Sequence, residues 1–173
     1  MTTLTVEALS SRSFAPFGRV IEPPGRDPDA IGPGWRWWAE TQLLEGDGRP
    51  WGVGLLDLEP AEMRFDWAER HLRTVEAVVA TGADLLLYVG PPNGFEEPAR
   101  VPALDRFRVF RIPAGRGVLL DRGVWHGAPL AAEGRCTALV LILEGTGRDD
   151  VTVVRFEDTP VAIDTSTEAT DKE

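Results

Sequence analysis

The stretch Ile112-Pro113-Ala114-Gly115-Arg116-Gly117-Val118-Leu119-Leu120-Asp121-Arg122-Gly123-Val124-Trp125-His126 decides the fold. Its proline and glycines favour two tight turns, because proline fixes φ and glycine adopts backbone angles that other residues resist. The apolar residues 117–120 between these turns have the length of a short strand. The stretch therefore predicts a β-hairpin that aims one histidine, His126, from a strand.

Short strand patterns cover most of the chain. Residues 63–67 alternate between apolar and charged side chains, as a half-buried strand does. Residues 74–80 and 84–89 indicate a second hairpin, and residues 137–143, apolar on both faces, indicate a strand covered on each side. A brief helix is expected near Ser13, capped by Ser10 or Ser11. About ten short strands with almost no helical periodicity predict a β-sandwich or barrel.

Composition limits the partners and the compartment. The chain has 173 residues and a net charge of −10, which disfavours nucleic acid and anionic membranes as partners. A small anionic substrate is compatible with this charge if arginines concentrate in a pocket. The single cysteine, Cys136, cannot form an internal disulfide. No apolar stretch is long enough to span a membrane and no secretory signal pattern is present, so we expect a cytoplasmic protein.

The length suits one domain, which we expect over residues 1–163. Residues 164–173 are polar and acidic, with a lone alanine, and are predicted to form a disordered tail. Three of the six tryptophans lie at positions 35, 37 and 38. Aromatic residues this close together usually cover a core or a subunit interface, and a wall for ligand stacking is the alternative.

Two motifs carry a family resemblance. The turns from Pro113 to His126 resemble the second motif of the cupin jelly roll. Residues 69–71 (Glu-Arg-His) followed by Glu76 resemble its first motif, with Glu69 in the place of the first histidine. Together with residues 13–21 and 117–130, they make the chain similar to the ureidoglycolate lyase family over roughly residues 4–156. Typical members carry Tyr-His-Arg-Asn before Val-Trp-His-His, where residues 120–127 here read Leu-Asp-Arg-Gly-Val-Trp-His-Gly, and they often carry glutamine at the position of Glu76.

The resemblance implies an all-β fold of the cupin type, a double-stranded β-helix (jelly roll) with a short N-terminal helix. It also implies a homodimer that releases urea and glyoxylate from ureidoglycolate or a closely related small 2-hydroxy/2-ureido acid. The alternatives are another cupin enzyme, such as a sugar or sugar-acid isomerase or a metal-dependent dioxygenase, and a non-catalytic cupin that binds a small acid.

The candidate site follows from the same motifs. Residues two apart share one face of a strand, which places Glu69 and His71 together. A turn through residues 72–74 would return Glu76 to them, and His126 would arrive from the other motif. Two imidazoles and two carboxylates suit a divalent ion such as Ni²⁺, Zn²⁺, Mn²⁺ or Fe²⁺. We expect His126 to be the acid/base, with Glu76 as the second candidate.

Ordinary structural roles compete with each of these assignments. An isolated His71 would be a partly exposed residue beside charged neighbours, and an isolated His126 a packing residue bonded to backbone. Arg70, Arg122 and Trp125 flank the motifs and are the expected substrate contacts, since a guanidinium grips a carboxylate in bidentate fashion. In an acidic protein the two arginines would be equally ordinary on the surface.

Overall fold

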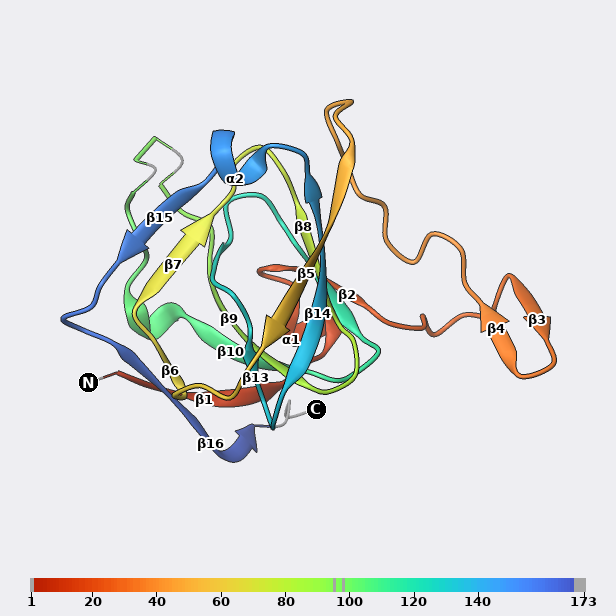
Figure 1. Ribbon diagram of the computed structural model, residues 1–173, viewed down its shortest axis with the longest axis horizontal. Coiled ribbons are helices and arrows are strands. Elements are labelled where there is room, and N and C mark those ends of the chain that lie inside the picture. Colours follow the sequence, from red (N-terminus) through yellow and green to blue (C-terminus); the bar gives the residue numbers. More distant parts are fainter. Residues whose placement is uncertain (1, 95, 98, 170–173) are drawn as a thin grey trace.

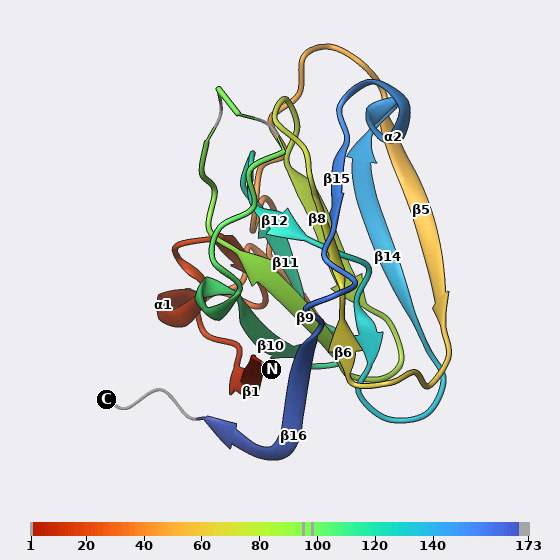
Figure 2. The ribbon, with the colours of Figure 1, turned by 90° about the vertical axis from the view of Figure 1, so that its left-hand side faces the viewer.

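The computed structural model describes residues 2–94, 96–97 and 99–169. Within them, two β-sheets face each other (Figures 1 and 2). The larger sheet has nine strands, in the order β15-β7-β12-β9-β10-β1-β16-β6, with β13 paired to β9. The smaller sheet has five strands, in the order β2-β11-β8-β14-β5. The strands are β1 (Thr3–Ala8), β2 (Gly18–Ile21), β3 (Ala30–Gly32), β4 (Trp35–Trp37), β5 (Trp51–Leu58), β6 (Arg64–Phe65), β7 (Trp67–Arg70), β8 (Glu76–Ala80), β9 (Leu85–Gly90), β10 (Arg108–Ile112), β11 (Gly117–Leu120), β12 (Trp125–His126), β13 (Leu130–Ala131), β14 (Cys136–Leu143), β15 (Thr152–Arg155) and β16 (Val161–Ala169).

The jelly roll expected from the sequence is confirmed, and so is the short N-terminal helix. Ser10 is the N-cap of helix α1 (Ser11–Phe14). Its side chain accepts a hydrogen bond from the backbone N–H of Ser13, and the Ser13 side chain accepts one from the backbone N–H of Ser10, which is a reciprocal capping box. A 3₁₀ turn, η1 (Leu104–Arg106), and a second helix, α2 (Thr146–Asp149), complete the described elements. Among the described residues, no helix is both long and apolar enough to cross a membrane.

The two predicted hairpins were wrong in their pairing. The turn after Ile112 carries the chain from β10 in the larger sheet to β11 in the smaller one, and the turn at Gly123 carries it back to β12. Likewise β8 and β9 lie in different sheets. The reason is that β11 pairs with β2 on one side and β8 on the other, so no edge of β11 is left for β10. The glycines of the turns behave as expected, with Gly115 at φ 79° and Gly123 at φ 80°.

The space between the sheets is filled at one end and open at the other. On the inner face of β8, Val78 and Ala80 belong to the core, whereas Glu76 does not; on β14, Ala138 is core, whereas Val140 lies beyond it. The core contains buried side chains from both sheets and from α1: Phe14, Phe17, Val20, Val78, Ala80, Leu85, Leu87, Val89, Phe110, Ile112, Val118, Leu120, Val124, Ala131, Cys136 and Ala138. The first residue of β8 and the last residues of β14 therefore lie at the open end.

The chain does not become irregular at Asp164, as the expected tail required. Strand β16 continues to Ala169 and runs parallel to β1, with Thr5 opposite Asp164 and Glu7 opposite Ala169. Ser166 also donates to the Asp164 carboxylate through both its backbone and its hydroxyl. Backbone pairing with β1 orders residues 164–169, and composition, which reports only the apolar content of a segment, does not detect such pairing. Residues 170–173 of the predicted tail lie outside the described residues.

An arm stands away from the body of the molecule (Figure 1). It is the two-stranded sheet β3–β4, residues 30–37, in which Ala30 pairs with Trp37 and Gly32 with Trp35. Trp35 and Trp37 remain 54% and 59% exposed. These two tryptophans therefore do not cover the core of this chain, which was one of the uses expected for the tryptophan cluster.

Candidate active site

Three strands bring the two histidines of the chain together. Glu69 lies on β7 opposite His126 on β12, and His71 follows directly after β7. Glu76 opens β8 in the facing sheet. The backbone N–H of Gly123 donates to the His71 carbonyl at 2.6 Å, which ties the turn before β12 to the end of β7. The sequence prediction that these four side chains meet in one cavity agrees with their placement.

The two imidazoles converge on one carboxylate. Nε2 of His71 lies 3.2 Å from Oε2 of Glu76, and Nε2 of His126 lies 3.3 Å from the same oxygen. The ring centroids are 5.3 Å apart. Nδ1 of His71 lies 2.8 Å from the Asp150 carbonyl, and Nδ1 of His126 lies 3.0 Å from the Val124 carbonyl. A carbonyl only accepts, so each Nδ1 carries the proton and each Nε2 of a neutral ring presents a lone pair to the carboxylate.

Two nitrogen lone pairs that face one carboxylate favour a proton or a cation between them. Burial is the largest single influence and would raise the pKa of Glu76, but the charges and hydrogen bonds of His126 and His71 together outweigh it and lower the pKa to about 2. Burial likewise disfavours charged His126, but the Glu76 carboxylate opposes burial and raises the His126 pKa overall. The Glu76 carboxylate is therefore ionised throughout the neutral range, and its charge favours the protonated form of His126.

The same atoms fit a divalent ion. One ligand atom each from Glu69, His71 and His126 lies within 4.8 Å of the other two. Nε2 of His126 is buried and makes no hydrogen bond to a described residue, although Glu76 Oε2 lies 3.3 Å away as its ion-pair partner. Nitrogen and carboxylate ligands of this kind are those that Zn²⁺, Ni²⁺, Mn²⁺ and Fe²⁺ accept. The donor set thus passes the chemical test for a metal centre.

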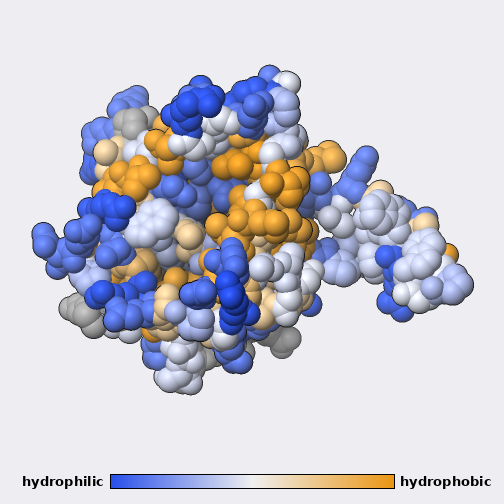
Figure 3. All heavy atoms as spheres, viewed as in Figure 1, coloured by the Kyte–Doolittle hydropathy of each residue, from blue (hydrophilic) through white to orange (hydrophobic). Residues whose placement is uncertain are grey.

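The cluster lies at the polar end of a cavity of about 440 Å³. In the space-filling view, apolar side chains gather around the hollow on this face of the molecule (Figure 3). The lining residues are Gly54, Leu55, Leu56, Glu69, His71, Glu76, His126, Gly127, Ala128, Pro129, Val140, Ile142, Gly147, Val151 and Val153. No arginine or lysine is among these described lining residues. The expectation of arginines concentrated in the pocket is therefore not met.

The three expected substrate contacts lie elsewhere, for a reason that strand geometry supplies. Successive side chains on a strand point to opposite faces, so Arg70 and Trp125 face away from the cavity that Glu69 and His126 enter. Arg70 is fully buried and donates to the carbonyls of residues 93, 94 and 97. Its guanidinium lies 4.6 Å from the Trp125 ring centroid. Arg122 is at the surface, 3.9 Å from Glu45.

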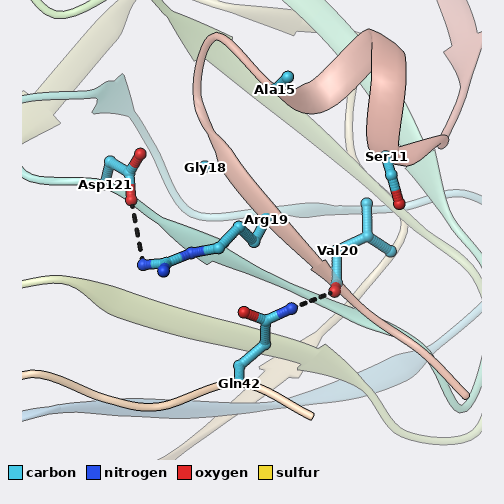
Figure 4. Close-up of a pocket in the computed structure, with 7 residues that line it drawn as sticks. All are labelled: Ser11, Ala15, Gly18, Arg19, Val20, Gln42 and Asp121. Atoms are coloured by element: carbon cyan, nitrogen blue, oxygen red, sulfur yellow. Dashed lines mark hydrogen bonds and ion pairs between the residues drawn. The ribbon is translucent and has the colours of Figure 1, made fainter. Parts of the chain in front are cut away.

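A separate hollow near α1 contains Asp121 (Figure 4). Its carboxylate faces Arg19 at 3.5 Å, and Gln42 donates to the Val20 carbonyl beside them. Arg19 and Asp121 are both about half exposed. Asp121 also accepts the Val124 N–H through its own carbonyl, as a turn residue does. Asp121 thus belongs to the turn and not to the histidine cluster.

Asp150 is a participant that sequence reasoning missed. Its carbonyl orients His71, and its carboxylate accepts the backbone N–H groups of Leu72 and Arg73 at 3.0 and 2.8 Å. It follows the four-residue helix α2, which begins at Gly145 in the left-handed region. A single helical turn has no periodicity to detect, and only the Gly-Thr-Gly sequence marked a change of direction here.

Comparison with known proteins identifies the family. The family model for ureidoglycolate lyase matches residues 1–164. The chain belongs to the ureidoglycolate lyase family. Ureidoglycolate lyase of Azotobacter vinelandii is 33% identical over 153 residues, covering 85% of this chain and 89% of the relative. The enzyme of Pseudomonas paraeruginosa is 32% identical over 155 residues, covering 86% and 88%. Among solved structures, a dTDP sugar isomerase from Desulfovibrio desulfuricans G20 gives a TM-score of 0.46 at 14% identity, covering 82% of this chain and 87% of that one.

Gly127 stands where the family pattern described above has a second histidine, and the structure gives the reason. A Cβ at this position would lie 1.6 Å from the hydroxyl oxygen of Tyr88. Tyr88 is fixed there because its hydroxyl donates to the Trp67 carbonyl and its ring stacks on Phe65 with centroids 3.9 Å apart. In this family member the tyrosine therefore occupies the space that a side chain at 127 needs.

We expect Gly127→Ala to lower the free energy of unfolding by about 2–3 kcal/mol, because neither the strand nor the stacked ring can retreat. Urea denaturation would measure the change, with Gly25→Ala as control, since no atom lies within 4 Å of a Cβ there. In a Tyr88→Leu background the cost of Gly127→Ala should shrink. An equal cost in both backgrounds would contradict the assignment to Tyr88.

Proposed function

We propose that this chain is a lyase that releases urea and glyoxylate from ureidoglycolate or a closely related small 2-hydroxy/2-ureido acid. The observation that carries the proposal is the convergence of both histidines on the Glu76 carboxylate inside one cavity. Membership in the ureidoglycolate lyase family supports the substrate class. The reaction needs little more than proton transfer at a fixed position, which this cluster can supply.

The chemistry uses a carbon that bears both a hydroxyl and a ureido nitrogen. A base removes the hydroxyl proton, the carbonyl of glyoxylate forms, and the carbon–nitrogen bond breaks. The electron pair leaves with the urea nitrogen, which takes a proton. Nε2 of His126 is placed to move that proton, and the Glu76 carboxylate stabilises the imidazolium between the two transfers.

A divalent ion would be held by Glu69, His71 and His126, with Glu76 beside them. When bound, it would supply Lewis-acid stabilisation of the developing negative oxygen. The Nε2 lone pair of His126 can bind either a proton or a metal ion, but not both at once. Whether a metal is bound therefore decides which residue moves the proton. His126 does so in the metal-free protein, and Glu76 does so when Nε2 is a ligand.

Charge supports a cationic centre in either form. The substrate is an anion, and the described lining residues provide two carboxylates without a lysine or arginine. Repulsion between like charges in a cavity of low dielectric would prevent binding unless the imidazoles or an ion compensate it. The substrate carboxylate is therefore expected to bind on the histidine side of the cavity, where arginine was expected from the sequence.

The direct test is the release of urea and glyoxylate in equal amounts from ureidoglycolate by protein purified without chelator. Metal content is measured on the same sample. We expect turnover well above the spontaneous decay of the substrate, and a loss of activity on chelation only if metal co-purifies. A rate equal to spontaneous decay, with metal present or restored, would overturn the proposal.

We also propose that the enzyme is a cytoplasmic homodimer. The outer face of β5 presents Val53 and Leu55, 69% and 76% exposed, and the arm exposes Trp35 and Trp37. Apolar side chains gathered on an edge strand and on an isolated two-stranded arm are typical of surfaces covered by a second copy. Light scattering should give twice the chain mass of 18.9 kDa, and Val53→Lys should shift the protein toward monomer. A monomeric wild type at micromolar concentration would contradict this.

A further inference from the structure

The cavity has a second region that the proposed reaction does not use. Its four charged or titratable side chains lie together, and much of the remaining lining is aliphatic. We define the apolar wall as Leu56, Val140, Ile142 and Val151. All four are half-buried, so each presents apolar surface to the cavity instead of packing completely into the core.

The backbone beside the wall, on the neighbouring strand β5, leaves room for a ligand. On the edge strand β5, Gly54 faces Val140 and Gly52 faces Ile142 across the pairing with β14. A Cβ on Gly54 would lie 3.7 Å from Cβ of Val140, an ordinary contact distance, and its φ is not positive. Neither crowding nor backbone conformation therefore requires glycine at 54. The glycine leaves open the part of the cavity beside Val140 that a side chain at position 54 would occupy.

Ureidoglycolate does not match this region. It is a small molecule that carries a carboxylate, a hydroxyl and a ureido group, all of which need polar partners. The cavity of about 440 Å³ lies within the range that binds much larger ligands, about 300–1,000 Å³. With ureidoglycolate at the histidine cluster, the apolar wall would face water, at the free-energy cost that apolar exposure carries.

We propose that the apolar wall binds an aliphatic group of the substrate, so that the preferred substrate is a 2-hydroxy-2-ureido acid with a short alkyl chain on its distal ureido nitrogen. The inference rests on the proposed function for the reaction itself. The bond that breaks joins the hydroxyl-bearing carbon to the proximal nitrogen, which takes the electron pair and a proton. The products are glyoxylate and an alkylurea, and the distal nitrogen changes neither its bonds nor its charge.

Turnover of two substrates tests the preference. We expect kcat/KM for the N-butyl analogue to exceed that for ureidoglycolate at least tenfold, because each methylene group of the chain that is buried against the wall adds to binding in the transition state. Val140→Thr, which keeps the shape and adds a hydroxyl, and Gly54→Val, which fills the space, should each lower this ratio at least fivefold. Val79→Thr makes the same change on the opposite face of the same sheet, opposite Leu139 of β14, and should leave the ratio within twofold.

Binding without turnover separates this inference from the proposed function. Calorimetry with glycolate, 2-hydroxybutanoate and 2-hydroxyhexanoate should show an affinity that rises about fourfold per methylene, and Val140→Thr should flatten the series. A rising series in a protein that turns over neither ureido acid would overturn the proposed function and leave the wall assigned. Turnover of ureidoglycolate with a flat series and no preference for the butyl analogue would overturn the inference and leave the proposed function intact.

Discussion

Replacing His126 with alanine should lower kcat for urea release by about 10² to 10⁴-fold, the contribution of a positioned acid/base group. Nε2 of His126 lies against the Glu76 carboxylate inside the cavity. Its Nδ1 is held by the Val124 carbonyl, so the ring cannot turn to present its other nitrogen. The loss is expected whether Nε2 carries a proton or a metal ion, because alanine can hold neither.

The variant needs a control for folding, since His126 is only 3% exposed. His126→Gln keeps most of the volume and a polar end but cannot shuttle a proton, and it should lose activity to a similar extent. Asp121→Asn changes a residue of the turn that precedes β12, in the separate hollow of Figure 4, and should retain wild-type turnover. A His126→Gln protein with wild-type melting temperature and wild-type kcat would exclude His126 from the reaction.

Removing the buried guanidinium of Arg70 should have the largest effect on stability. Arg70→Met is expected to lower the free energy of unfolding by about 3 kcal/mol, because three loop carbonyls lose a charged donor and the Trp125 ring loses its partner. Arg64→Met is the matched control. Arg64 is about half exposed and pairs with the exposed Glu62, so less than about 0.5 kcal/mol should be lost.

The same residue distinguishes a structural role from the substrate contact that the sequence suggested. If Arg70 held the substrate carboxylate, Arg70→Lys would raise KM while the midpoint of urea denaturation stayed constant. The structure predicts the reverse, because lysine cannot reach several carbonyls with one planar group. A normal denaturation midpoint with a raised KM would restore Arg70 to the active site.

Local pattern was sufficient for most strands and for the histidine cluster, but not for the pairing between strands. Residues 117–120 form a strand with the expected bounds, and the two histidines meet as the motif spacing indicated. A tight turn between two strands is compatible both with a hairpin and with a passage to the facing sheet. Only the partners of β11, far away in the sequence, decide between them.

The errors at the site have a different origin. Chemical type and proximity in sequence suggest Arg70 and Trp125 as substrate contacts, but the alternation that places Glu69 and His126 inside the cavity places these two side chains outside it. Asp150 could not be found in this way, since its contact with His71 joins residues 79 positions apart through a backbone carbonyl. The aliphatic lining was visible in residues 137–143, but an apolar strand facing a cavity resembles one facing a core.

The bond from the Gly123 N–H to the His71 carbonyl has a consequence for how such sequences can diverge. It anchors the chain three residues before His126. Because side chains on a strand alternate between its two faces, one inserted or deleted residue between 123 and 126 would move the imidazole to the face on which Trp125 now lies. Loops that do not lead into a strand of the site are free of this constraint. Gaps in an alignment of descendants should therefore accumulate in the loops and spare the four positions from 123 to 126.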